Sequence, residues 1–345
     1  MSHSTVPRTD TEAEEGKKNP PKVHGGHTGA PGRPPTGRLS LRLRFGRDRV
    51  LLLMTLPAVV LLLVFNYVPI LGNVVAFQEY DPYLSDNGVV SILHSPWVGL
   101  ENFQRIFEDS AFWNAVQNTL VLFVLQLLLY FPIPILLALL INSVVRPRVR
   151  AISQAILYLP HFFSWVLVVA VFQQLLGGAG LLSQLLRRHG YDGLDIMTDP
   201  ETFKFLITAQ SVWKDAGWGI IVFLAALASV SPDLYEAAAM DGANRWRRMW
   251  HVTLPALRPV VALLLVLRVG DALTVGFEQI LLQRGAVGPG AAEVLDTFVW
   301  WNGVRNQDFG YAAAAGLVKG VISLGLVLAA NKVAHLMGEQ GVYKK

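Results

Sequence analysis

The stretch EAAAMDGANRWRRMWHVTLPALRP, from Glu236 to Pro259, is a polar segment between two blocks of apolar residues that are long enough to cross a membrane. It carries four arginines, namely Arg245, Arg247, Arg248 and Arg258. A segment with this much charge is costly to bury in lipid. We therefore expect it to lie in water between two spans and to contact a partner there.

The rest of the composition agrees with a membrane protein. Of the 345 residues, 52% are hydrophobic and 16% are charged, and the mean hydropathy is +0.41, which is too apolar for an ordinary soluble domain. The sequence predicts an all-α integral membrane protein with six transmembrane helices. Their approximate ranges are 51–77, 114–142, 152–176, 203–230, 256–283 and 312–334. No cysteine is present, so we expect neither disulfides nor a thiolate metal site. We also expect no cofactor.

Segments rich in basic residues alternate along the chain with segments that contain few, and this alternation predicts the topology. Arginines crowd the region before the first span, the 146–150 loop and the opening stretch, whereas the first loop has only Arg105. By the positive-inside rule both termini and the 231–255 loop are cytoplasmic. The third loop, with Arg187 and Arg188, fits this pattern least well. Residues 1–40 have few apolar side chains and are expected to be a disordered basic tail, followed by a six-helix domain over 41–345.

Local signals predict a bent pair of helices in the 231–255 loop. Ser231 suits a helix cap and Pro232 the first helical position, while Gly242 permits a turn. In the second helix Trp246, Met249 and Trp250 share one face, and Leu254-Pro255 is expected to end it. The pair is therefore predicted to dock against a cytoplasmic partner. The alternative is an amphipathic helix that lies on the lipid surface.

The motif Glu236-Ala237-Ala238, followed by Gly242, Val252 and Leu254-Pro255 at fixed spacing, resembles the EAA loop of ABC importer permeases. The family usually has Ile where Val252 stands. The resemblance extends from about Tyr67 to Val342 and points to the carbohydrate-uptake branch, with polysaccharide and complex-oligosaccharide permeases most similar. The segments that carry it are SPWVGLENF (95–103), YLPHFFSWVLVVA (158–170), WKDAGWGIIVFLAALASVSPDLYEAA (213–238), VGFEQILL (275–282), VLDTFVW (294–300) and GEQGV (338–342).

This resemblance implies a type I ABC importer permease in the bacterial cell membrane. The implied partners are a second permease, two cytoplasmic ATPase subunits, an extracellular substrate-binding lipoprotein, a carbohydrate substrate and membrane lipid, with no nucleic acid. The chain has no G-x-x-x-x-G-K-[ST] phosphate loop, so ATP hydrolysis would belong to another subunit. The residues implied in coupling to that ATPase are Glu236, Ala237, Ala238, Asp241, Gly242, Ala243, Trp246, Leu254 and Pro255.

Charged residues inside the spans form the second group of candidates. Lys214 and Asp215 lie in the fourth span, and Asp215 and Asp271 are both about fifteen residues, roughly 22 Å, from the shared loop. We expect one compact ion-pair cluster between the fourth and fifth spans, because unpaired intramembrane charges are costly. Its members would be Lys214, Asp215, Arg268, Asp271 and Glu278, the last three on one helix face. The cluster either clamps the helices or lines the translocation pathway.

Aromatic residues are the candidates for sugar contact, since their flat faces stack on the C–H faces of a pyranose ring. The candidate sugar contacts are Trp165, Trp213, Trp218 and Phe277, with Trp300 and Trp301 also available. Alternatively, several of them are anchors at the membrane surface, where Trp is enriched.

Two other classes of function stay open from the residues alone. A secondary transporter or channel for a small polar solute would use the intramembrane charges for ions, but the EAA loop argues against it. A membrane-embedded glycosyltransferase would need an acidic or histidine constellation in a loop. His161 is the best single candidate for such a site, and a packed helix-bundle histidine explains it better.

Overall fold

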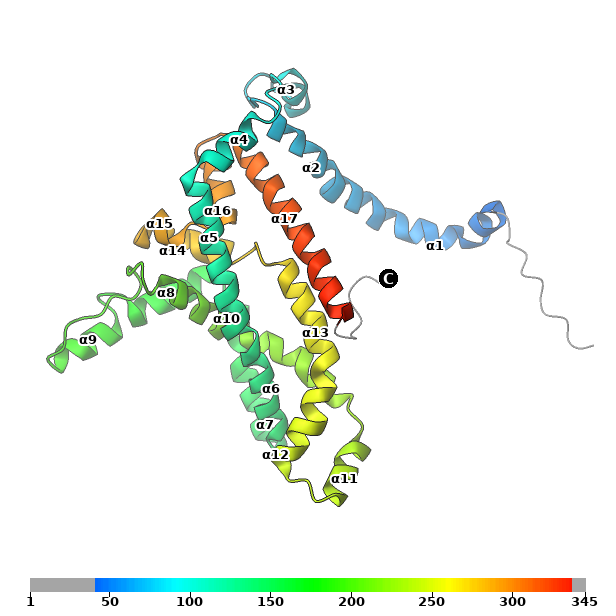
Figure 1. The fold of residues 1–345 in the computed structure, drawn as a ribbon, viewed down its shortest axis with the longest axis vertical. Coiled ribbons are helices and arrows are strands. Elements are labelled where there is room, and N and C mark those ends of the chain that lie inside the picture. Colours follow the sequence, from blue (N-terminus) through cyan, green and yellow to red (C-terminus); the bar gives the residue numbers. More distant parts are fainter. Residues whose placement is uncertain (1–40, 337–345) are drawn as a thin grey trace, which may run out of the picture. The chain divides into compact units, whose positions relative to one another are not determined.

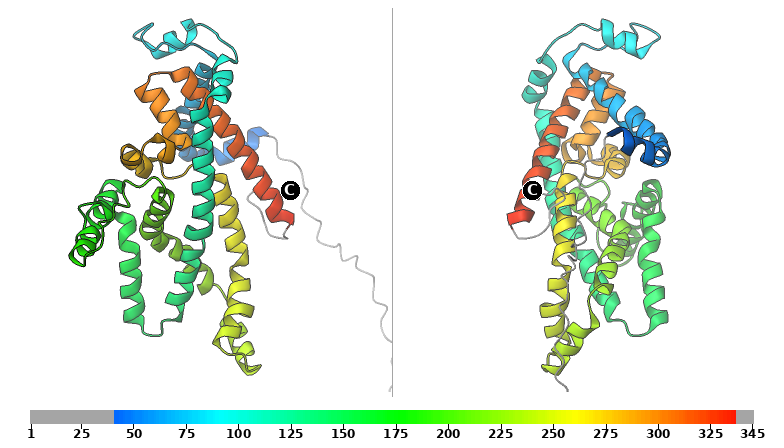
Figure 2. Two further views of the ribbon diagram at one scale, coloured as in Figure 1. Left: turned by 60° about the vertical axis from the view of Figure 1, so that its left-hand side comes forward. Right: turned by 90° about the vertical axis from the view of Figure 1, so that its right-hand side faces the viewer.

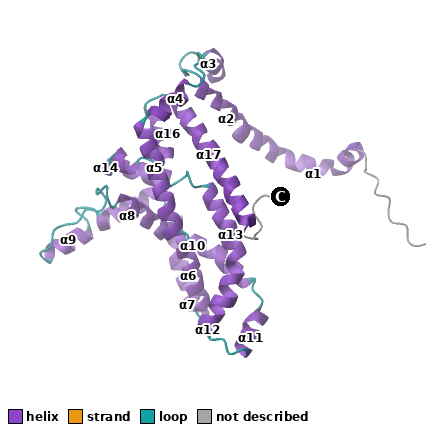
Figure 3. Ribbon diagram, in the orientation of Figure 1, coloured by secondary structure: helices purple, strands orange, loops and turns teal. Residues whose placement is uncertain are grey.

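A computed structural model describes residues 41–336. In this range every regular element is helical, and the strand-like pairing is limited to an isolated bridge between Gln78 and Trp97 (Figure 3). The all-α prediction is therefore confirmed. The basic tail 1–40 and the GEQGV segment lie outside the described residues.

Six helical segments in the described range are long and apolar enough to cross a membrane, as the sequence predicts. Their bounds are Leu53–Phe77, Ser110–Ser143, Trp165–Arg188, Phe203–Ala228, Arg245–Gly270 and Phe309–Leu336. The third and fifth differ from the predicted ranges.

The chain divides into two units between Leu62 and Leu63. The described part of the first unit is helix α1 (Leu41–Leu62), which contains Pro57. The first candidate span crosses this boundary and continues into the second unit as a π-helical segment, Leu63–Tyr67, and a 3-10 segment, Gly72–Phe77.

The second unit holds the other helices, labelled in Figure 1. They are α2 (Val68–Leu71), α3 (Gly88–His94), α4 (Glu101–Glu108), α5 (Ser110–Leu125), α6 (Pro132–Ser143), α7 (Pro147–Tyr158), α8 (Trp165–Leu176), α9 (Leu181–Arg188), α10 (Phe203–Ala228), α11 (Pro232–Met240), α12 (Arg245–Arg248), α13 (Leu254–Gly270), α14 (Phe277–Val287), α15 (Pro289–Ala292), α16 (Leu295–Trp300) and α17 (Phe309–Leu336).

Helix α10 is the central element of this unit. It packs against α5, α6, α7, α13 and α14. Helix α13, yellow in Figure 2, packs in turn against α17, which is red. Gly217 permits the closest approach, because a Cβ atom there would lie 1.9 Å from the Leu157 carbonyl oxygen of α7. Glycine at this position thus lets the two backbones touch.

The third predicted span, 152–176, is not one helix. The chain forms α7, then a 3-10 turn over Leu159–Phe162, and restarts at α8. Pro160 lacks the N–H that a continuous helix needs, and the Ser164 hydroxyl caps α8 by accepting from the Leu167 N–H at 3.4 Å. The break places His161 against helix α10.

The fifth predicted span, 256–283, is also interrupted. Helix α13 ends at Gly270, and α14 begins after Gly276, whose φ is +62°. At its other end, α13 is joined to α12 by a π-helical segment, Met249–Thr253, so the helix does not end at Leu254-Pro255 as expected. The wide π turn accommodates the missing N–H of Pro255.

Candidate functional site

The predicted bend between α11 and α12 is present and is built from capping interactions. The Ser231 hydroxyl accepts from the Asp233 N–H at 3.3 Å, with Pro232 as the first residue of α11. The Asn244 side chain accepts from the Arg247 N–H at 2.9 Å and starts α12. Each helix of the pair therefore has its own N-cap.

The end of α11 is closed by the carbonyl groups of Ala238, the last residue of the EAA motif, and of Ala239. The Gly242 N–H donates to the Ala239 carbonyl at 3.0 Å, and the Ala243 N–H donates to the Ala238 carbonyl at 2.9 Å. Gly242 has φ +73°, so this is a Schellman motif with glycine at its left-handed position. Nothing lies within 4 Å of a Cβ built at Gly242, and the elbow therefore presents an open surface.

The tip of the loop is exposed and partly apolar. Glu236, Ala237 and Asp241 are exposed, while Ala238, Ala243, Leu254 and Pro255 are half-buried. Met240 is 90% exposed, and Trp246 is 64% exposed with its ring 5.9 Å from that of Trp250. Exposed apolar side chains at the tip of a short loop are typical of a surface that a partner covers.

His161, Lys214 and Asp215 meet where the 3-10 turn Leu159–Phe162 packs against α10. The His161 Nδ1 lies 2.8 Å from Asp215 Oδ1, and Lys214 Nζ donates to the His161 carbonyl oxygen at 2.7 Å. Lys214 Nζ is also 3.8 Å from Asp215 Oδ1. The His161 ring stacks on Trp218 at 4.6 Å. The sequence analysis did not include His161 among the transport residues. The signal that could have indicated its position is Pro160, which interrupts the helix next to it.

Arg268 makes different contacts from those expected. Its guanidinium donates to the Gln126 side-chain oxygen and lies 5.2 Å from the centre of the Tyr130 ring. Among the described residues no ion pair joins Lys214 or Asp215 to Arg268 or Asp271, so the predicted single network is not formed by direct contact.

Glu278 does not share a helix with Arg268, whereas Asp271 caps the C-terminal end of the helix that carries Arg268. Asp271 follows the last residue of α13, Glu278 lies in the first turn of α14, and the left-handed Gly276 separates them. Both carboxylates are exposed within this chain, and no described residue pairs with either. The expectation failed because the apolar block 256–283 contains two helices.

A buried amide network joins α10 to α14, and sequence reasoning missed it. Gln279 Nε2 donates to Gln210 Oε1 at 2.7 Å and to the Ile207 carbonyl at 2.9 Å, and its Oε1 accepts from the Ser211 hydroxyl at 3.0 Å. Gln283 Nε2 donates to Gln210 Oε1 at 2.9 Å. The three glutamines are at most 3% exposed. The network fixes the start of α14 relative to the central helix.

The candidate sugar-contact residues fall into two places. Trp165 lies beside the Lys214 ammonium, 5.5 Å from ring centre to Nζ, and Trp218 covers His161. Trp213 packs edge-on against Phe172 and is 40% exposed. Phe277 is elsewhere, edge-on to Trp300 at 6.5 Å in a cavity of about 590 Å³. Trp165 and Trp218 are therefore the two that adjoin the charged group.

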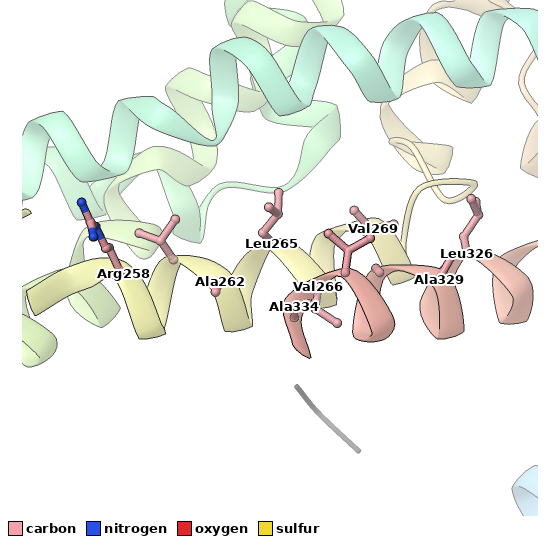
Figure 4. Close-up of a pocket in the computed structure, with 11 residues that line it drawn as sticks. Arg258, Ala262, Leu265, Val266, Val269, Leu326, Ala329 and Ala334 are labelled. Atoms are coloured by element: carbon pink, nitrogen blue, oxygen red, sulfur yellow. The ribbon is translucent and has the colours of Figure 1, made fainter. Parts of the chain in front are cut away.

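A second cavity, of about 600 Å³, lies between α13 and α17. Figure 4 shows its lining side chains, which are aliphatic except for Arg258 at one end. Such a surface lacks the hydrogen-bond partners that a sugar requires. The His161 group is the better candidate for contact with a polar ligand. No cluster of three metal-ligating side chains occurs among the residues that the structure describes.

Comparison with known proteins identifies relatives over most of the chain. Residues 130–336 match the family model described as "Binding-protein-dependent transport system inner membrane component". The polygalacturonan/rhamnogalacturonan transport system permease protein YteP of Bacillus subtilis is 43% identical over 89% of this chain and 94% of the relative. The arabinooligosaccharides transport system permease protein AraP of Bacillus subtilis is 30% identical over 84% of this chain and 90% of the relative.

A solved structure also matches the fold. In a bacterial alginate ABC transporter in complex with an alginate pentasaccharide-bound periplasmic protein, one chain superposes with a TM-score of 0.79. That chain is 37% identical, and the match covers 88% of this chain and 99% of that one. The helical arrangement described above is therefore that of an ABC transporter permease.

Proposed function

The chain belongs to the family of binding-protein-dependent transport system inner membrane components and is a multi-pass membrane permease of an ABC importer, and we propose that it moves an oligosaccharide or a polysaccharide fragment, driven by a separate ATPase. The observation that carries this proposal is the exposed elbow between α11 and α12. It is rigidly capped, open at Gly242 and uncovered within this chain.

The elbow is proposed to receive the motion of the ATPase on the cytoplasmic side. The positive-inside pattern supports this orientation, since Arg245, Arg247 and Arg248 lie on the loop and Arg146, Arg148 and Arg150 on the neighbouring one. The helix α12 continues through the π segment into α13. A displacement at the elbow is thereby transmitted along one helix to Arg268 near its other end.

The translocation pathway is proposed to run beside the cluster that His161, Asp215 and Trp218 form. The half-exposed Asp215 carboxylate accepts hydrogen bonds from sugar hydroxyls, and the Trp218 ring, 52% exposed, offers a stacking face. Arg268 adds a cation whose Nε is buried without a hydrogen-bond partner. Since no described carboxylate pairs with it, Arg268 suits a saccharide that carries carboxylates. The polygalacturonan/rhamnogalacturonan named for one relative, and the acidic polysaccharide alginate named for a solved transporter, support that choice.

The partners follow from the family. We propose a heterodimer with a second permease, two ATPase subunits bound to the elbows and an extracellular substrate-binding lipoprotein that delivers the sugar. The chain contains no phosphate-binding loop of its own.

The test is reconstitution of the complete transporter in vesicles with the binding lipoprotein. Uptake of an acidic oligosaccharide should require ATP on the cytoplasmic side, and substrate-loaded lipoprotein should stimulate ATP hydrolysis. Uptake that persists after ATP depletion would instead favour a secondary transporter or channel.

A further inference from the structure

A cavity of about 370 Å³ lies where the end of α6 faces the elbow helices. Arg245 and Arg248 line it from α12, Tyr235 from α11, and Asn142 and Ser143 from the last residues of α6. It is distinct from the exposed elbow tip at Gly242, which does not line it.

The cavity is cationic and incomplete. No carboxylate lines it, and neither Arg245 nor Arg248 forms an ion pair with a described residue. The Nε atom of Arg248 is inaccessible to solvent and has no hydrogen-bond partner. A buried donor on a charged group is costly when it is left unsatisfied. The site is therefore built for an anion that accepts hydrogen bonds.

The depth of the cavity points to lipid as the source of that anion. Ser143 ends the helical segment of one candidate span and Arg245 begins that of another, and from this we infer that the cavity lies near the end of the apolar part of the membrane. Its remaining lining is apolar, from Leu139, Val145 and Met249, with Trp246 at its edge. An interfacial tryptophan beside an apolar wall and two arginines matches a lipid headgroup with its acyl chain.

We propose that this cavity binds the phosphate headgroup of an anionic phospholipid from the cytoplasmic leaflet, with an acyl chain along α6. Only the orientation of the loop is taken from the proposed function. Bound there, the lipid bridges α6 to α12 and stiffens the base of the elbow. The rival occupant is a carboxylate of the ATPase subunit, and the experiment separates the two.

The experiment uses the complete transporter in vesicles of phosphatidylcholine with and without phosphatidylglycerol. The acyl chains of one lipid at a time carry bromine, which quenches nearby tryptophans, and subtraction of a Trp246→Phe variant isolates the Trp246 signal. Brominated phosphatidylglycerol should quench Trp246 more strongly than brominated phosphatidylcholine. Arg248→Gln should lower this preference about fivefold, the factor expected for one cation that binds a headgroup.

Arg247 supplies the matched control, because it directly precedes Arg248 on α12, is exposed and does not line the cavity. Arg247→Gln should keep the preference. Arg248→Lys, which keeps the charge but loses Nε, should retain part of it and serves if Arg248→Gln does not assemble. Inorganic phosphate, added to the phosphatidylglycerol vesicles, should not displace the lipid.

Four results would overturn the proposal. Equal quenching by the two lipids, or equal loss in Arg247→Gln and Arg248→Gln, would leave no specific lipid site. Displacement by inorganic phosphate would assign the cavity to a soluble anion. Loss of ATPase subunits from Arg248→Gln with unchanged quenching would assign it to the ATPase. Quenching requires no transport, so its outcome stands apart from that of the uptake test.

Discussion

The Nδ1 atom of His161 lies 2.8 Å from Oδ1 of Asp215, and this contact joins the break in the third span to the central helix α10. The His161 ring also stacks on Trp218, so one oxygen of the carboxylate is held beside an exposed indole face. A fixed hydrogen-bond acceptor next to an aromatic plane is the minimal arrangement for binding a pyranose ring.

Asp215→Ala should destabilise the protein and reduce uptake, because it removes the carboxylate that pairs with His161 and lies 3.8 Å from the Lys214 ammonium. A fully buried pair loses about 3–5 kcal/mol when one member is removed, and we expect about 1–3 kcal/mol here because solvent reaches Asp215. Thermal unfolding in detergent and membrane abundance measure the effect. Asp271→Ala, at an exposed carboxylate with no partner among the described residues, is the control and should leave the unfolding temperature unchanged. Equal loss in both variants would contradict the assignment.

Gly242→Trp should abolish uptake and substrate-stimulated ATP hydrolysis while the protein still inserts in the membrane. The left-handed φ of +73° strains any other L-residue except Asn and Asp, and an indole would cover the open elbow.

Gly242→Asn is the matched control, since Asn tolerates the left-handed conformation and adds little bulk. It should keep most of the transport activity. Normal coupling in Gly242→Trp would rule out the elbow as the ATPase contact. An equal loss of uptake in Gly242→Trp and Gly242→Asn would show that the size of the side chain is not what impairs coupling.

Gln279→Leu should lower the unfolding temperature of the permease. The substitution leaves the Ser211 hydroxyl without its acceptor and removes the bond that Gln279 donates to Gln210, which keeps Gln283 as a partner. An unsatisfied buried group costs about 1–3 kcal/mol. Gln184→Leu is the comparison, because Gln184 donates only one exposed hydrogen bond, to the Ala179 carbonyl. If both variants unfold at the same temperature, the amide network contributes nothing to stability.

Gly217→Ala tests the contact between α7 and α10. A methyl group there would lie 1.9 Å from the Leu157 carbonyl oxygen, so the helices must separate and the protein should fold poorly. Gly325→Ala, in α17 where a Cβ meets nothing within 4 Å, should be neutral or stabilising by about 0.5–1 kcal/mol. Comparable abundance of the two variants would show that the helices can move apart freely.

The sequence predicts those parts of the fold that depend on neighbouring residues. Hydropathy identifies six spans, and Ser231, Pro232 and Gly242 predict the capped elbow because each acts through its own backbone conformation. Averaged hydropathy does not detect the breaks at Leu159–Phe162 and at Asp271–Gly276, since the residues around them are still apolar.

The candidate site was harder to predict because its contacts join distant parts of the chain. Equal depth along two helices suggested that Asp215 would meet Arg268, but depth does not specify which way a side chain points around its helix. Asp215 faces His161, and Arg268 faces Gln126 across a different helix pair. The amide pairing of Gln210 with Gln279 is likewise invisible until α10 and α14 are placed side by side.

Arg268→Gln tests whether the substrate is acidic. The guanidinium has a buried Nε without a partner and no carboxylate to neutralise it among the described residues. It should therefore strengthen the binding of a sugar that carries a carboxylate more than that of a neutral sugar. Uptake of uronate oligosaccharides at low concentration should fall about tenfold, the factor that corresponds to roughly 1.4 kcal/mol. Uptake of a neutral oligosaccharide, if it is transported, should change little.

Arg258→Gln is the control for charge alone, because Arg258 lies on the same helix, ten residues or about 15 Å away, and is exposed. Arg268→Lys keeps the cation and should restore part of the uronate uptake. The deciding quantity is the ratio of uronate to neutral uptake in each variant, measured at matched membrane abundance. A ratio that is unchanged in Arg268→Gln would mean that Arg268 serves only to hold Gln126 and Tyr130 in place, and the acidic substrate class would lose its support from this chain.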